Sequence, residues 1–344
     1  MLKSTYSIIS LVVIALAVAC DNAWSQGAAI QEAPPSVAGA RIILLGTGGG
    51  PLPRKYRAQP ASLLVVDGSA YLIDAGDGVI RQLTWADTSV THLKSVFLTH
   101  HHLDHTAGLG SVIAYRWIAI MSGAVLPPLQ IFGPPGTQEI SDAAMKYFSV
   151  SERIFRSEAP TAPALASIIA AHDAMPGLIY EDAKIRVTAV ENSHYSTVIM
   201  PDTPHGVDKS YSLRFDTKYG AIVFTGDTGP SEALVNLAKD ADILVSEVID
   251  VADLSNFLRG RKNLPEASAQ MMIAHMEHEH LPPEDLGKLA AKAHVKMVVL
   301  THLSTSGEVK PDMTPFTAGI QQHYSGPVIA GQDLSEFDLT QVRK

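Results

Sequence analysis

The chain has 344 residues, enough for one large domain or two smaller ones with a sizeable core. Hydrophobic residues make up 46% and charged residues 18%, which is typical of a folded protein and excludes a disordered one. A net charge of -9 gives no general attraction for phosphate backbones, so we expect no nucleic-acid partner. The 14 histidines indicate a site that uses imidazole, and a small ligand is the first expectation.

The first 25 residues are expected to form a signal peptide. Lys3 is followed by the apolar run 8–19, which is short for a bilayer span and typical of a secretory signal. Two cleavage sites compete, one before Cys20, which would give a lipid-anchored protein, and one after Ser25. We therefore expect an exported protein, periplasmic or secreted, that meets a membrane only through its signal or a lipid anchor. An uncleaved anchor would also leave the folded part outside the cytoplasm.

The rest of the chain is expected to be a linker followed by one folded domain. Residues 26–39 are rich in Ala and Gln and contain a Pro-Pro pair, as linkers often do. Residues 40–344 contain the apolar runs and turn residues of a folded domain. Cys20 is the only cysteine, so the domain holds no internal disulfide and no thiolate ligand. Any metal site must use His, Asp and Glu.

Short apolar runs that end in turn residues predict strands, and apolar residues that recur three or four positions apart predict helices. Strands dominate the first half and alternate with helices in the second, which favours two sheets between layers of helices. Residues 109–120 look helical, as do 231–239 after a Ser cap and 283–293, which opens with Pro. The predicted strands are 41–45, 61–66, 70–74, 94–99, 184–190, 211–215, 221–225, 243–246 and 297–301.

A cluster of histidines directly follows the predicted strand 94–99. Three imidazoles and a carboxylate in one turn can converge on cations that prefer nitrogen and oxygen donors. A solvated His-rich loop is the alternative, but it would not require an aspartate at this spacing or a buried strand before it. We expect His101 to point away from the site. The candidate ligands are His100, His102, Asp104 and His105.

The pattern at residues 100–105 resembles the HxHxDH signature of the metallo-β-lactamase superfamily. Further motifs follow in that family's order, so the resemblance covers nearly all of residues 41–344. These motifs contain Asp74 in Asp-Ala-Gly-Asp-Gly, His194, Asp227 in Thr-Gly-Asp-Thr and His302 in Leu-Thr-His-Leu. The ribonuclease Z and arylsulfatase-like branch is the most similar, on residues 45–51, Arg57, 226–228 and 246–248. The resemblance implies an α/β fold, the αββα four-layer sandwich, and two Zn²⁺ ions, with Mn²⁺ or Fe²⁺ as alternatives.

The resemblance also assigns roles to individual residues. It implies that His100, His102 and His194 hold the first metal, that Asp104, His105 and His302 hold the second, and that Asp227 bridges them. Asp74 is expected to hydrogen-bond a ligating imidazole rather than bind metal itself. Because the later ligands sit at the ends of predicted strands, we expect them to share one pocket.

The implied chemistry is hydrolysis without a protein nucleophile. A metal pair makes hydroxide available near neutral pH and screens the charge of an anionic ester. The resemblance nominates Asp104, His280 and Glu247 as catalytic residues, with His280 as the general acid and Glu247 orienting it. The neighbouring histidines leave the register open by two residues, so His278 is the alternative acid.

We expect an exported hydrolase of small anionic esters, either phosphodiesters or aryl sulfates. Ribonuclease Z enzymes carry a long arm between the third-His and bridging-Asp motifs, and residues 195–226 leave little chain for one. A ribonuclease Z-like endonuclease and a lactonase or β-lactamase are alternatives, and an iron-dependent redox enzyme is a minor one. A protein that only binds a partner would have broken ligand motifs, and none is broken. The sequence leaves open whether the chain forms a homodimer.

Overall fold

The computed structural model describes residues 38–310 and 312–342. The expected signal peptide, Cys20 and nearly all of the expected linker lie outside the described residues. Within the described ranges, every helix is too short or too polar to cross a membrane.

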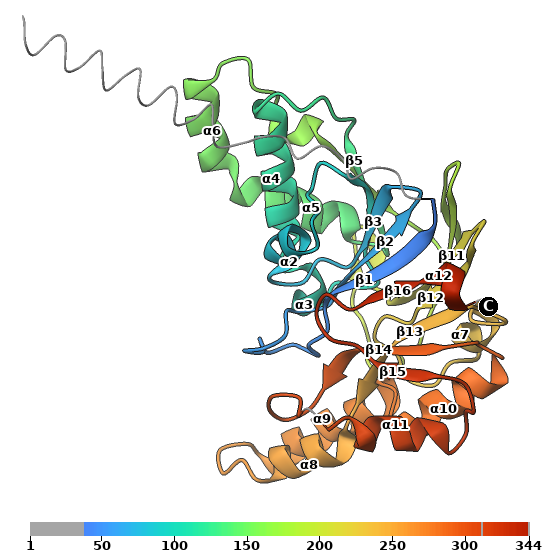
Figure 1. Cartoon of the computed structure of the whole chain (residues 1–344). Helices are drawn as coiled ribbons and strands as arrows, with labels where there is room; N and C mark the ends of the chain where they lie inside the picture. Colours follow the sequence, from blue (N-terminus) through green and yellow to red (C-terminus); the bar gives the residue numbers. More distant parts are fainter. Residues whose placement is uncertain (1–37, 311, 343–344) are drawn as a thin grey trace, which may run out of the picture.

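Two sheets of seven strands form the centre of the molecule (Figure 1). In the first sheet, β16, β1, β2 and β3 are antiparallel and β3 to β6 are parallel. Its strands, in spatial order, are β16 (Glu336–Asp338), β1 (Ala40–Gly46), β2 (Ala61–Val66), β3 (Ser69–Ile73), β4 (Leu93–Phe97), β5 (Leu129–Gly133) and β6 (Ile169–Asp173).

The second sheet is also mixed, parallel from β15 to β12 and antiparallel from β12 to β7. Its strands are β15 (Val328–Ala330), β14 (Val298–Ser304), β13 (Ile243–Ile249), β12 (Gly220–Phe224), β11 (Tyr211–Thr217), β8 (Ile185–Glu191) and β7 (Gly177–Glu181). A separate small hairpin joins β9 (Asp202–Thr203) and β10 (Gly206–Val207).

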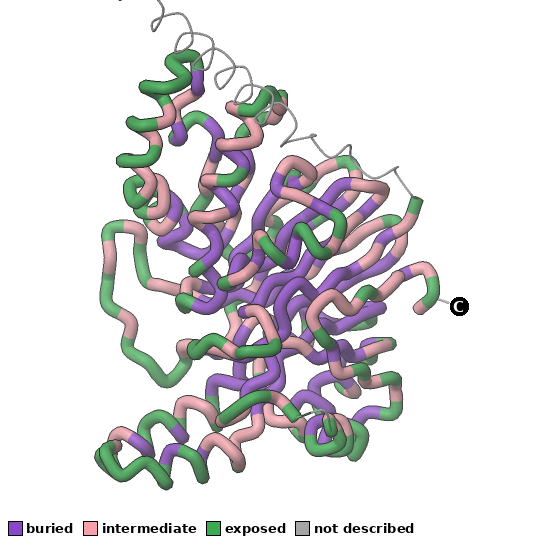
Figure 2. The backbone as a smooth tube through the Cα atoms, turned by 60° about the vertical axis from the view of Figure 1, so that its left-hand side comes forward, coloured by how far each residue is buried: buried purple, intermediate pink, exposed green. Residues whose placement is uncertain are grey.

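Alternation along the strands sends successive side chains to opposite faces, so each sheet is apolar on both sides. In β1, Ile42 and Leu44 belong to the core between the sheets, whereas Ile43 and Leu45 belong to the core under the helices. Phe97 of the first sheet packs edge-to-face against Phe215 of the second, with ring centroids 5.2 Å apart. The core between the sheets is therefore continuous from one sheet to the other (Figure 2).

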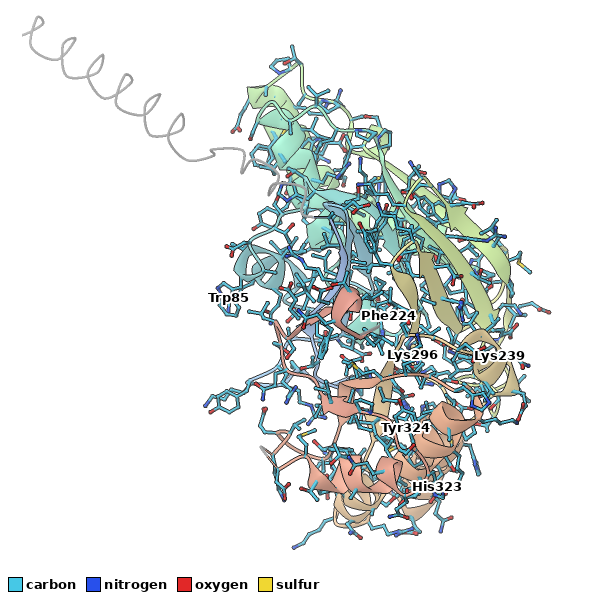
Figure 3. The ribbon with its side chains drawn as sticks, turned by 45° about the vertical axis from the view of Figure 1, so that its right-hand side comes forward. Trp85, Phe224, Lys239, Lys296, His323 and Tyr324 are labelled. Carbon is cyan, nitrogen blue, oxygen red and sulfur yellow. The ribbon has the colours of Figure 1, made fainter. Side chains whose placement is uncertain are left out.

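Helices cover the outer face of each sheet (Figure 1). On the first sheet these are α2 (Val79–Trp85), α3 (Leu103–Thr106), α4 (Leu109–Met121), α5 (Thr137–Tyr147) and α6 (Ser149–Glu158), with a 3₁₀ turn at Leu165–Ser167. On the second they are α7 (Glu232–Leu237), α10 (Pro283–Lys292) and α11 (Thr314–Gln321). α8 (Val251–Arg259) and α9 (Glu266–Glu279) form a hairpin with a small core of its own, and α12 (Leu339–Val342) lies beside β1. Just after α11, the buried Tyr324 donates its hydroxyl to the carbonyl of Val295 (Figure 3).

The predicted αββα sandwich is confirmed, and each predicted strand lies where a strand is found, with its ends shifted by up to three residues. The segment 141–169, for which the sequence predicted no single element, is built of several. That segment ends α5, forms α6 and a 3₁₀ turn, and then begins β6. β6 is an edge strand of half-exposed residues, so it lacks the alternation that reveals a strand in a sequence.

Candidate metal centre

The seven predicted ligands meet at one edge of the sandwich. His100 follows β4 of the first sheet, and Asp227 follows β12 of the second. The ligand atoms fall into two groups, each within 4.8 Å, and all the residues are buried except His102. The first group is His100, His102, His194 and Asp227, and the second is Asp104, His105 and His302.

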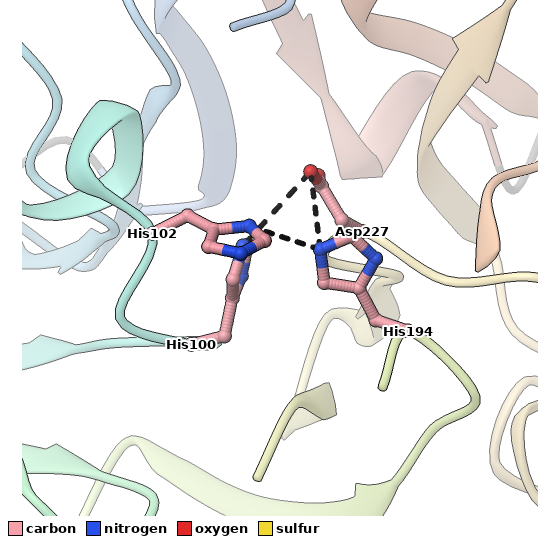
Figure 4. Close-up of side chains that lie close together, drawn as sticks. All are labelled: His100, His102, His194 and Asp227. Atoms are coloured by element: carbon pink, nitrogen blue, oxygen red, sulfur yellow. Dashed lines mark hydrogen bonds and ion pairs between the residues drawn. The ribbon is translucent and has the colours of Figure 1, made fainter. Parts of the chain in front are cut away.

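The first group surrounds one carboxylate oxygen (Figure 4). The Nε2 atoms of His100 and His194 each lie 3.9 Å from Oδ2 of Asp227. His102 closes the group, with its Nδ1 atom 3.1 Å from Nε2 of His194. Because His102 is the exposed member, this side of the group faces the solvent, where a substrate can approach.

The second group shares the same aspartate. Nε2 of His105 lies 3.4 Å from Oδ1 of Asp227, and Nε2 of His302 lies 3.2 Å from Oδ2. Oδ2 of Asp104 lies 3.4 Å from Nε2 of His302 and 3.7 Å from that of His105. Asp227 therefore stands between the two groups, as a bridging ligand would.

Buried atoms without partners test whether metal ions fit here. Nε2 of His100, Nε2 of His105 and Oδ1 of Asp227 are buried and make no hydrogen bond. Buried polar atoms are nearly always paired, and three unpaired ones at a single point indicate that a ligand supplies the missing bonds. Nitrogen and carboxylate donors at this spacing suit two divalent cations.

Electrostatics favour the metal-binding protonation states at His100, His194 and Asp227. Burial lowers the pKa of His100 and of His194 well below the usual value, so both imidazoles are neutral. Burial opposes ionisation of Asp227, but nearby His302 and His105 outweigh it and hold its pKa well below the usual range. Neutral imidazoles and an ionised carboxylate are the forms that coordinate a cation. At His105 and His302 burial disfavours the charged imidazole, but Asp227 outweighs it and raises the pKa of both, so a metal ion has to displace their protons.

Asp74 orients the ligating histidines through contacts on the side away from the metal site. Its Oδ2 atom lies 2.9 Å from Nδ1 of His105, and its Oδ1 atom accepts the backbone N–H of Thr99 at 2.8 Å. The Thr99 hydroxyl lies 3.1 Å from Nδ1 of His100. This network sets the orientation of two ligating rings and leaves their Nε2 atoms directed at the centre.

Unusual backbone geometry accompanies these contacts. Asp74 and His302 have positive φ angles of 58° and 43°, a region that costs free energy for residues other than glycine. Gly50 lies against Asp104, and a Cβ atom at this position would be 1.8 Å from the Asp104 carboxylate. Glycine is therefore required here, because any side chain would displace a ligand.

The proposed acid lies beside the ligand groups. Nδ1 of His280 lies 2.7 Å from Oε2 of Glu247, and Oε1 of Glu247 accepts the N–H of Thr228 at 2.6 Å. Burial disfavours the charged imidazole, but the Glu247 carboxylate outweighs burial and raises the pKa of His280 to about 9. His280 therefore holds a proton near neutral pH. His278, the alternative acid, is exposed.

A buried carboxylate joins α9 to the segment that follows His194. Glu279 is fully buried, accepts the N–H of Thr197 at 2.6 Å and also its hydroxyl, and lies 2.5 Å from Nδ1 of His275. The backbone carbonyl of Glu279 lies 3.0 Å from Nδ1 of His194. One residue thus orients a metal ligand and precedes the acid His280.

The structure brings all the sequence-predicted site residues together, and His101 lies outside the ligand groups, with its Nε2 atom 2.9 Å from the Thr137 hydroxyl. Sequence reasoning missed the roles of Thr99, Thr197 and Glu279. A threonine before a His cluster carries no distinctive signal. Glu279 lies in the polar run 275–280, where its burial could not be distinguished from exposure.

The αββα sandwich with two His and Asp ligand groups defines the chain as a metal-dependent hydrolase. Residues 69–303 match a family described as the beta-lactamase superfamily domain. The chain is 30% identical over 263 residues to the ribonuclease Z of Mycolicibacterium gilvum (strain PYR-GCK), covering 76% of this chain and 83% of that protein. It belongs to the metallo-β-lactamase superfamily, in the ribonuclease Z branch.

Solved structures agree on the fold. The metallo-beta-lactamase fold protein YhfI from Bacillus subtilis superposes with a TM-score of 0.63 at 18% identity, covering 87% of this chain and 99% of that one. The short form of human tRNase Z superposes with a TM-score of 0.59 at 21% identity, with the same coverage.

These relatives correct two expectations from the sequence. The expectation of no nucleic-acid partner is wrong, because relatives at about this chain's own length are named ribonuclease Z, and that name denotes action on RNA. The ribonuclease Z relatives also support the ribonuclease Z-like alternative over a hydrolase of small anionic esters such as aryl sulfates. The error came from net charge, which reports the average surface and says nothing of a local cationic patch.

Proposed function

We propose that the chain is a phosphodiesterase of the ribonuclease Z type that cleaves RNA with a pair of zinc ions. The observation that carries the proposal is the pairing of the His280 and Glu247 side chains beside two metal-ligand groups joined by Asp227. The similarity to ribonuclease Z over most of the chain supports RNA as the substrate. Sequence features of residues 1–25 support export, so we propose that this RNA cleavage takes place outside the cytoplasm.

The ligand groups would hold two Zn²⁺ ions, which act as Lewis acids on the phosphodiester and make hydroxide available near neutral pH. His280 supplies the proton for the leaving oxygen. Its Nδ1 atom is engaged by Glu247, so Nε2 is the nitrogen that delivers the proton. Glu247 is itself held by the N–H of Thr228, which keeps the imidazole in one orientation.

Hydrolysis of small phosphodiesters is the second candidate. It is favoured by the short connection between His194 and Asp227, where β9 and β10 have two residues each and the remaining strands belong to the sheet. Such a connection presents little surface to a large substrate. A small ester would need only the ligand groups and the acid.

The test uses one zinc-loaded preparation and three substrates: an RNA stem with a single-stranded 3′ extension, bis-nitrophenyl phosphate and nitrophenyl sulfate. We expect a single cut in the RNA near the end of the stem, with slower turnover of the phosphodiester. Turnover of bis-nitrophenyl phosphate without any RNA cleavage would overturn the main proposal in favour of the second. Faster turnover of the sulfate ester would contradict both.

A further inference from the structure

A protein with a net charge of -9 needs a local group of cations if it is to hold RNA. Two stretches of this chain place three cations within four residues: Arg54, Lys55 and Arg57, and Arg259, Arg261 and Lys262. The second set, which we call the tip cations, lies where α8 turns into α9. An inference about RNA contact rests on the proposed function, and these two sets are the places to look.

In the first set, Arg54 and Arg57 hold the fold, which leaves Lys55 as the one exposed cation, with its Nζ atom 4.9 Å from the ring centroid of Tyr56. Arg54 donates to the carbonyl oxygens of Gly49 at 3.1 Å and Thr305 at 2.7 Å. Arg57 donates to the Thr47 hydroxyl at 2.6 Å and to the carbonyl of Gly331 at 2.9 Å. Burial lowers the pKa of both arginines, which shows that their guanidinium groups are partly removed from water. Neither side chain is free to follow an RNA backbone.

The tip cations, unlike Arg54 and Arg57, lie in the solvent. All three are exposed, and among the described residues none of them forms an ion pair with a carboxylate. Arg261 lies over the exposed ring of Phe257, 5.6 Å from its centroid. The nearest acidic residue along the chain, Glu266, accepts a hydrogen bond from Gln270 at 3.0 Å. Unpaired cations beside an exposed aromatic ring are the chemistry that binds phosphates and bases.

The tip is connected to the metal centre through a single helix. α9 has 14 residues, a length of about 21 Å, and it ends at Glu279, directly before His280. The α8–α9 hairpin has a small core of its own, formed by Leu258, Ala269 and Ile273. Figures 1 and 2 show this hairpin projecting from the body beyond the second sheet. A backbone held at the tip would therefore lie about one helix length from the bond that is cut.

We propose that the tip cations Arg259, Arg261 and Lys262 bind the phosphodiester backbone of the RNA substrate away from the cleaved bond. The hairpin then acts as a docking arm whose base also carries the acid and, through the carbonyl of Glu279, orients His194. A small ester does not reach the tip. The tip cations therefore separate RNA from small phosphodiesters as substrates.

The test replaces all three tip cations with glutamine (Arg259→Gln, Arg261→Gln, Lys262→Gln) in the full, metal-loaded chain. A matched control replaces three exposed cations of the α5–α6 region, Lys146, Arg153 and Arg156, with glutamine and so removes the same charge. We expect KM for a stem RNA to rise about tenfold in the tip variant only, because three phosphate contacts are lost. Kinetics on bis-nitrophenyl phosphate should be unchanged in both variants, which also shows that both fold.

Salt dependence supplies a second measurement that needs no cleavage. The affinity of each protein for a stem RNA without the 3′ extension, which has no junction left to cut, is measured against salt concentration. The slope of log affinity against log salt should become shallower by about 2 to 3 in the tip variant, since each phosphate contact contributes roughly 0.7 to 0.9. Equal slopes for the tip variant and the control would overturn the proposal, as would equal KM values for RNA. If the wild type binds RNA through the tip but does not cut it, the docking arm stands and the proposed function fails.

Discussion

Asp227 joins the two ligand groups because its Oδ2 atom faces histidines of both groups. Oδ1 lies nearest to His105, and Oδ2 lies nearest to His302, with His100 and His194 farther away. Gly226, which precedes it, has a φ of +59°, a left-handed conformation that glycine adopts without strain. The turn after β12 thus delivers one carboxylate to the middle of the six other ligands.

Replacing Asp227 with alanine should abolish hydrolysis and reduce bound metal to one ion per chain or fewer, because both groups lose a ligand. Elemental analysis of the dialysed protein measures the metal directly. The matched control is Asp77→Ala, which removes an exposed aspartate close to Asp74 in the sequence and should keep two ions. Two ions per chain in Asp227→Ala would disprove the bridging role.

Replacing His280 with alanine should slow the reaction most for esters with poor leaving groups, because the departing oxygen no longer receives a proton. Loss of about 10²- to 10⁴-fold is typical when a general acid is removed. Metal content should stay at the wild-type value. The experiment compares a series of phosphodiesters whose leaving groups differ in pKa, with His278→Ala as the control. A uniform loss across the series would speak against proton donation.

At the scale of elements, four strands determine where the site residues stand, since His100 and Asp227 follow strands whereas Glu247 and His302 lie within them. β4, β12, β13 and β14 bring His100, Asp227, Glu247 and His302 to one edge, and these strands are apolar runs that their sequence reveals. The ligand motifs and the fold could therefore be predicted from the sequence. The α8–α9 hairpin could not, because its burial is limited to a few residues and its two helices are largely exposed. Contacts between segments distant in sequence, such as Thr197 with Glu279, leave no local pattern.

Glu279 connects α9 to the segment that follows His194, and replacing it should loosen that segment. In Glu279→Ala the N–H and hydroxyl of Thr197, an exposed residue, lose two hydrogen bonds to a charged acceptor, a loss of about 1 to 3 kcal/mol of stability. Metal affinity should fall by roughly 10-fold or more, because the segment beside His194 is no longer held. Hydrogen exchange of residues 195–199 should accelerate. Glu277→Ala, an exposed neighbour on α9, is the control and should change neither property.

At the scale of the whole molecule, the metal centre connects the two halves of the sandwich. His100, His102, Asp104 and His105 follow β4 in the first sheet, whereas His194, Asp227 and His302 belong to the part of the chain that builds the second. Metal ions held between them would cross-link the sheets at this edge. Without metal, the two carboxylates and the unpaired imidazole nitrogens stay buried, which is unfavourable.

Removing metal with a chelator should therefore lower the Tm of the whole domain and not only its activity. Ligands that bind only the native state stabilise it by about 4 kcal/mol at a thousand times their Kd, so zinc in that excess should raise the Tm by several degrees. Calorimetry of the chelated and zinc-loaded protein, at constant protein concentration, measures the difference. Asp227→Ala should show a much smaller difference, because its ligand groups are incomplete. If the chelated and loaded wild-type proteins unfold at the same temperature, the ions do not join the two sheets.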